Sequence, residues 1–135
     1  MGELDRDSRL VAYILARLGC SHPFRVSRIL LLADWRAEDV GLGRLTEGLS
    51  YVAEPYGFYV EGLQEILERL ERSGCLRRRE EERCLEYTCA EPDLTPRERE
   101  VLDEVIRDVS DLSDRELNRL VTGDQRYLEL TGRGR

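Results

Sequence analysis

The sequence predicts a mainly α-helical domain that contains one small β-hairpin. Three observations support this fold class. Apolar residues recur at helical spacing through most of the chain, Gly74 ends the most regular of these segments, and a short stretch rich in arginine and glutamate follows it. A helix followed by a β-hairpin is the outline of a winged-helix domain. We therefore expect a single domain over residues 1–135, with a winged-helix-like core at about 8–90 and additional C-terminal helices at about 95–130.

The length and composition are those of one globular domain with a heavily ionised surface. Of the 135 residues, 41% are hydrophobic and 36% are charged, which is enough apolar material for a core. No apolar run approaches the roughly 20 residues of a membrane-spanning helix, and residues 1–9 lack the apolar region of a signal peptide. We therefore expect a cytoplasmic protein without a membrane partner. All 21 basic residues are arginine, which points to a thermophilic source or a GC-rich genome.

Two helices are expected in the first third of the chain. Asp7 or Ser8 can cap the first helix, and Gly19 ends it. Ser21 offers a cap for the second helix, and Pro23 fits its first turn. The residues expected to face the core are Leu10, Val11, Ile14, Leu15 and Leu18 in the first helix, and Val26, Ile29, Leu30, Ala33 and Ala37 in the second. Leu31, Leu32 and Trp35 widen the apolar face of the second helix, so we expect it to be the most buried element.

The middle of the chain should hold an extended segment, a third helix and the hairpin. Residues 43–59 have no helical period; their alternation is typical of a short strand or extended segment, and Pro55-Tyr56-Gly57 is a turn signal. Residues 75–79 and 83–89 flank three glutamates and should pair as the hairpin. The third helix is predicted from the spacing of Val60, Leu63, Ile66, Leu67 and Leu70.

The last third carries clear helix-start signals. Capping boxes begin at Thr95 and at Ser113, and Gly123 ends the second of these two helices. Tyr127, Leu128 and Leu130 are placed to pack a short closing segment.

The four cysteines form no CxxC pair, and the single histidine does not stand at a zinc-finger offset from them. Buried or partly buried free thiols are the favoured interpretation, and a metal site is the least favoured. A structural disulfide is the alternative, because intracellular proteins of hyperthermophiles do form them. Any bridge should join Cys75 to Cys84 or to Cys89.

The chain resembles the Panacea family, which includes SocA-like antitoxins and proteolytic adaptors, and the related YwgA-like proteins. The matching segments are residues 28–35 of the second helix, Leu45, the turn at residues 55–59 and the late helix at residues 113–122. Arg28, Phe58 and Val60 depart from the family's lysine, proline and serine. The resemblance implies a winged-helix-like fold and a protein that binds other proteins, as an antitoxin or regulator, without enzymatic activity.

The third helix and the hairpin form the candidate binding surface. In a winged helix the third helix enters the major groove and the hairpin contacts the DNA backbone. A net charge of −7 and an acidic exposed helix face oppose strong binding to phosphates. A solvated, ion-paired surface is therefore favoured over direct DNA contact. The candidate contacts to a partner or to nucleic acid are Arg69, Arg72, Arg77, Arg78, Arg79, Arg83, Tyr56 and Tyr59.

A protein-interaction module is the second hypothesis. Tyr51, Tyr56, Phe58 and Tyr59 gather around the turn, and aromatic residues are favoured at interface centres, although at least two should cap the core instead. A homodimer built on the acidic C-terminal helices would also bury apolar surface, but nothing in the sequence fixes one. We favour a non-enzymatic regulatory or antitoxin-like protein that binds a macromolecule, with a dimeric DNA-binding transcriptional regulator as the alternative.

An enzyme is the least favoured class. Asp34, Glu38 and Asp39 lie close together in the second helix, and carboxylate clusters can hold a metal or act as acid and base. No glycine-rich phosphate loop or histidine partner accompanies them, and clusters of this kind are ordinary in so charged a chain, so a solvated face of the helix is the favoured interpretation. We expect no catalytic residue, no metal site and no cofactor.

Overall fold

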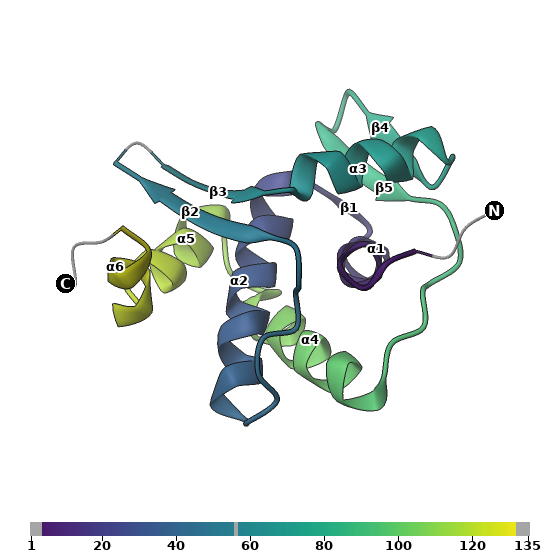
Figure 1. The fold of residues 1–135 in the computed structure, drawn as a ribbon. Coiled ribbons are helices and arrows are strands. Elements are labelled where there is room, and N and C mark those ends of the chain that lie inside the picture. Colours follow the sequence, from purple (N-terminus) through teal and green to yellow (C-terminus); the bar gives the residue numbers. More distant parts are fainter. Residues whose placement is uncertain (1–3, 56, 132–135) are drawn as a thin grey trace.

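The computed structural model describes residues 4–55 and 57–131. Within those ranges the chain forms six helices and five short strands, so the predicted mainly α-helical class is confirmed. The elements are α1 (Arg6–Leu18), β1 (Cys20–Ser21), α2 (Pro23–Asp39), β2 (Ser50–Glu54), β3 (Gly57–Glu61), α3 (Leu63–Arg72), β4 (Leu76–Arg79), β5 (Cys84–Tyr87), α4 (Pro96–Val109), α5 (Asp114–Thr122) and α6 (Gln125–Thr131) (Figure 1). No helix in the described part has the length and apolarity needed to cross a membrane.

Helix α2 lies at the centre of the molecule. It contacts α1, α4 and α5, and Figure 1 shows α5 and α6 on one side of it and α1 on the other. Helix α1 is enclosed just as thoroughly, since each of the six residues 10–15 is at most 1% exposed. Helices α2, α3 and α4 and strand β5 all contact α1. Helix α1, which the sequence predicted to bury only one face, is therefore surrounded by other elements.

The helix ends follow local capping signals, with two corrections. Both predicted capping boxes form, at the starts of α4 and α5, and glycines end α1 and α5 as expected. At α1, however, Asp5 provides the cap by accepting the backbone N–H of Ser8, so the predicted caps Asp7 and Ser8 are wrong. At α2 the cap is His22 and not Ser21, because Ser21 belongs to β1.

Three strands form a small antiparallel sheet in the order β1–β5–β4. The β4–β5 pair is the predicted hairpin, with Leu76 opposite Tyr87 and Arg79 opposite Cys84. Strand β1 was not predicted, because two residues are too few to show a period. It adds to the outer side of the hairpin by pairing with β5.

A second hairpin, β2–β3, occupies the segment predicted to be a short strand or extended, so the strand alternative is confirmed. Val60 was expected to begin the third helix, but it pairs with Tyr51 in the ladder, and α3 begins at Leu63. Gly62 separates strand from helix with a φ of 99°, and a Cβ there would lie 2.9 Å from Leu49 Cδ2. Only glycine fits that junction without rearrangement.

Two disulfides secure the three-stranded sheet. Cys20 of β1 is bonded to Cys84 of β5 with a Cα–Cα distance of 5.4 Å, and Cys75 is bonded to Cys89 across the base of the hairpin at 4.9 Å. The described residues contain no free cysteine, so the favoured expectation of free thiols is wrong. The pairing of Cys75 with Cys89 is one of the two that the sequence left open, whereas the Cys20–Cys84 bridge contradicts the expectation that any bridge would involve Cys75.

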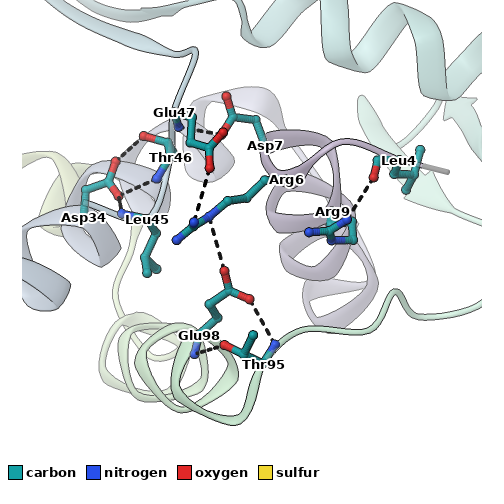
Figure 2. A network of polar contacts seen from close by, with 10 residues as sticks. All are labelled: Leu4, Arg6, Asp7, Arg9, Asp34, Leu45, Thr46, Glu47, Thr95 and Glu98. Atoms are coloured by element: carbon teal, nitrogen blue, oxygen red, sulfur yellow. Dashed lines mark hydrogen bonds and ion pairs between the residues drawn. The ribbon is translucent and has the colours of Figure 1, made fainter. Parts of the chain in front are cut away.

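Two buried carboxylates hold the long connection between α2 and β2 (Figure 2). Asp34 of α2 is 2% exposed and accepts hydrogen bonds from the backbone N–H and the hydroxyl of Thr46. Asp7 of α1 accepts the backbone N–H groups of Glu47 and Gly48 at 2.8 and 2.6 Å. This role explains why Asp7 does not cap its own helix. The connection is thereby fixed to both central helices.

Arg6 joins the same region to α4. Its Nη1 lies 3.2 Å from Glu47, and its Nε lies 3.3 Å from Glu98, the glutamate of the first capping box (Figure 2). Glu98 thus accepts the backbone N–H of Thr95 and also pairs with Arg6. The start of α4 is held against the start of α1 by this contact.

Tyr13→Phe should lower the free energy of unfolding by about 1 kcal/mol. The Tyr13 side chain is 1% exposed and donates a 2.6 Å hydrogen bond to Asp103 of α4. Burial, together with that hydrogen bond and the charge of Asp103, raises the pKa of Tyr13 from 10.0 to about 12. The protonated phenol therefore stabilises the folded chain fully below pH 10, and this contribution is lost as the pH rises from 10.0 to about 12.

Urea unfolding measured across this pH range checks the prediction. The stability of the wild type should fall more steeply than that of Tyr13→Phe. Equal pH dependence of the two proteins would contradict it.

Candidate functional site

The candidate surface is made by α3 and the β4–β5 hairpin, which contact each other. Helix α3 buries Leu63, Ile66, Leu67 and Leu70 and leaves its other face exposed. Gly74, with a φ of 84°, then turns the chain directly into β4. The predicted arginines therefore lie on two adjoining elements at one end of the molecule (Figure 1).

The pleat of β4 divides its arginines between two faces. Arg78 lies on the same side of the strand as the buried Leu76, and its Nε lies 3.1 Å from the Glu71 carboxylate of α3. Arg77 and Arg79 lie on the opposite, exposed side. The sequence predicted that all three arginines lie in the hairpin, but it did not predict on which side of the strand each side chain lies.

Several of the candidate arginines are paired with carboxylates of the same chain. Arg79 contacts Glu82 at 2.7 Å and Glu86 at 3.3 Å, and the hydrogen bonds that it donates to these two carboxylates raise the pKa of Arg79. Arg69 lies 3.6 Å from Asp5, at the start of α1. These arginines are partly neutralised before any partner arrives.

Three other exposed arginines among the candidate contact residues are not paired with a carboxylate of the described residues. Among the described residues, Arg72, Arg77 and Arg83 make no ion pair within 4.0 Å. Arg83 lies in the hairpin turn with a left-handed φ of 56°. They are the arginines best able to contact an external anion.

Carboxylates dominate the exposed face of α3 and the strand that leads into it. Glu61, Glu65 and Glu68 are all exposed and precede the two arginines near the end of the helix. A polyanion approaching along this face would meet the glutamates first and be repelled.

A cavity of about 340 Å³ lies between the hairpin and the amino end of α2. His22 and Pro23 line it from the helix side, and Arg78, Arg79 and Arg83 line it from the hairpin side. The amino end of the helix and Arg83, which is unpaired among the described residues, favour negative charge there. Glu80 also lines the cavity, however, and Arg78 and Arg79 are already paired with glutamates. The sequence did not indicate this cavity, because β1 brings the start of α2 beside the hairpin and β1 had no signal of its own.

The aromatic residues of the second hairpin divide into core and surface. Tyr51 and Phe58 stack with ring centroids 6.1 Å apart, and the Tyr51 hydroxyl donates a 2.5 Å hydrogen bond to Asp34. Burial, together with the charge of Asp34, raises the pKa of Tyr51 well above its usual value. Tyr59 is 48% exposed, whereas Tyr56 lies outside the described residues. Tyr59 is therefore the aromatic candidate that the structure places at the surface.

The carboxylates considered for catalysis do not act together. Asp34 is buried and bonded to the connection after α2, whereas Glu38 is exposed and Asp39 pairs with Arg126 at 3.1 Å. Over residues 4–55 and 57–131, no group of three or more His, Cys, Asp or Glu side chains is arranged to hold a metal ion. The sequence took Asp34 for part of a solvated face, and that interpretation is wrong.

Comparisons of the chain with protein-family models, with curated proteins and with solved structures found no match. The resemblance to the Panacea family therefore stays a prediction.

Proposed function

We propose that this chain is a non-enzymatic regulatory protein, antitoxin-like in its mode of action, that binds a protein partner. The arrangement of charge on α3 and the β4–β5 hairpin carries the proposal. Arg69, Arg78 and Arg79 are held by carboxylates of the chain, and further glutamates are exposed beside them. Such a surface offers a protein both signs of charge, whereas it opposes the approach of a polyanion. The exposed Tyr59 lies on β3, the strand that leads into α3.

The order of the elements supports a winged-helix-like core. Strand β1 lies between the first two helices, α3 is followed by the β4–β5 hairpin, and the sheet order is β1–β5–β4. A winged helix likewise places a strand after its first helix and a hairpin, the wing, after its third. On this proposal α3 is the third helix, β4–β5 is the wing and β2–β3 is an insertion before α3.

A dimeric DNA-binding regulator is the second candidate function. It is favoured by the cavity at the amino end of α2, where Arg78, Arg79 and Arg83 converge. Arg77 and Arg83 are exposed and outside any ion pair of the described residues, so they are able to reach phosphate oxygens.

Fluorescence anisotropy with labelled duplex from the chain's own upstream region separates the two candidates. If the partner is a protein, binding should stay weak even at low salt, and Arg77→Ala/Arg83→Ala should change it little. Arg36→Ala is the control, because it removes an arginine that lies outside the hairpin and its cavity and is already paired with Glu104 and Asp108. Sub-micromolar binding with a steep salt dependence, lost in the double variant and kept in the control, would instead establish the DNA-binding function.

Affinity capture from the native host, using Tyr59→Ala and Val40→Ala as a matched pair, tests the protein-partner proposal directly. Both side chains are well exposed, at 48% and 55%, but only Tyr59 belongs to β3, the strand that leads into α3. A specific partner should be retained by the wild type and by Val40→Ala and lost by Tyr59→Ala. A partner retained equally by all three proteins would place the interface away from this surface and overturn its assignment.

A further inference from the structure

Arg28 is a buried cation without a carboxylate partner. Its side chain lies in α2, it is 7% exposed, and it forms no ion pair within the described part of the chain. Asp114, a nearby carboxylate at the start of α5, pairs with Arg25 instead, at 3.4 Å. Burying an unpaired charge is costly, so a buried guanidinium of this kind indicates a binding role.

Two aromatic rings and one amide hold the guanidinium in place. Its central carbon lies 3.7 Å from the ring centroid of Phe24 and 5.0 Å from that of Phe58. Nε and Nη2 both donate to the side-chain oxygen of Asn118, at 3.3 and 3.1 Å, and Nη1 donates to the Ser27 hydroxyl at 3.0 Å. The group is therefore fixed in orientation by partners that do not neutralise its charge.

The count of donors leaves part of the guanidinium unused. An arginine side chain has five N–H groups, and three of those of Arg28 are donated within the chain. One N–H on Nη1 and one on Nη2 remain. Burial lowers the pKa of Arg28, with Tyr127 and Asp114 acting in the opposite direction, but arginine stays protonated at physiological pH.

These side chains line a cavity of about 470 Å³ between α2, the β2–β3 hairpin, α5 and α6. Phe24, Arg28 and Phe58 line it together with Tyr127 of α6. Figure 1 shows α5 and α6 on the side of α2 away from α1. The volume is within the range of small-molecule sites.

We propose that this cavity binds a small aromatic carboxylate, with the carboxylate held by Arg28 and the ring packed among Phe24, Phe58 and Tyr127. The two remaining N–H groups, on adjacent nitrogens of a planar fork, match the two oxygens of a carboxylate. The aromatic lining provides apolar surface for the rest of the molecule. Glu54, which also lines the cavity, repels a dianion more than a monoanion, which favours a carboxylate over a phosphate. The proposal is independent of which macromolecule the chain binds.

Isothermal titration with benzoate, benzamide and phenyl phosphate as probes tests the site. Benzoate should bind to the wild type, and benzamide, its neutral analogue, should bind roughly tenfold or more weakly, because it cannot form a charged pair with Arg28. Benzamide binding as tightly as benzoate would overturn the proposal. Phenyl phosphate binding more tightly than benzoate would overturn the assignment of a carboxylate.

Three variants locate the site. Arg28→Lys keeps the charge without the planar fork and should weaken benzoate binding roughly tenfold or more. Thr122→Trp changes an exposed residue at the cavity wall and should block binding without touching Arg28, so it tests the site even if Arg28→Lys fails to fold. Arg36→Lys is the control on the same helix, because Arg36 is already paired with Glu104 at 3.1 Å. Unchanged benzoate affinity in Thr122→Trp, with its fold verified by circular dichroism, would overturn the proposal.

Discussion

Replacing Cys20 and Cys84 together with alanine should lower the free energy of unfolding by about 4 kcal/mol. The two residues are 64 positions apart, so their disulfide closes a long loop in the unfolded chain and removes much of its conformational freedom. The bridge also holds β1, a strand of only two residues, against β5. Urea unfolding followed by circular dichroism, under non-reducing conditions, measures the effect.

Cys75→Ala/Cys89→Ala is the matched variant. Its disulfide spans only 14 positions, so the expected loss is about 3 kcal/mol. In the presence of a strong thiol reductant, the wild type and both variants should converge, because all three then lack both bridges. Identical urea midpoints for the wild type and the Cys20/Cys84 variant without reductant would contradict this account.

Asp34→Ala should cost about 3–5 kcal/mol, because one buried carboxylate organises the connection from α2 to β2. Asp34 accepts the backbone N–H groups of Leu45 and Thr46 at 2.7 and 3.1 Å. It also accepts the hydroxyls of Thr46 and Tyr51 at 2.6 and 2.5 Å, and Arg44 lies 3.5 Å away. Truncation leaves these donors in a buried site without an acceptor, which costs far more than the loss of one exposed hydrogen bond.

Asp39→Ala is the control for this prediction. Asp39 lies on the same helix, but its side chain is 60% exposed and makes one ion pair with Arg126. Exposed pairs contribute at most about 1 kcal/mol, so this variant should remain close to the wild type. Chemical denaturation of both variants decides the matter; equal stability of Asp34→Ala and Asp39→Ala would show that the network around Asp34 is not a major anchor.

The sequence predicted which elements carry most of the candidate arginines, but not which of these arginines are paired with carboxylates. Helical spacing and the alternation after Gly74 placed the arginines on α3 and the hairpin. The pairing of Arg79 with Glu82 is local, three residues along the chain. That of Arg69 with Asp5 joins residues 64 positions apart, and no local pattern indicates it. Whether an arginine is available to a partner was therefore decided by tertiary contacts.

Arg28 illustrates the same limit more strongly. The sequence noted it only as a departure from a family motif. Its environment is built by Phe58, which is 30 positions away in the chain, and by Asn118, which is 90 positions away. Neither the burial of its charge nor the cavity beside it follows from the neighbouring residues in α2.

The sequence by itself determined the mainly α-helical class, both capping boxes, the glycine ends of α1 and α5 and the β4–β5 hairpin. These features arise from residues within a few positions of each other, where spacing, caps and turns act directly on the backbone. Only the tertiary structure decided that β1 joins the sheet, that Cys20 meets Cys84 and that Asp34 anchors a distant connection. Each of these depends on pairing between groups far apart in the chain, and such pairing leaves no periodic signal along it.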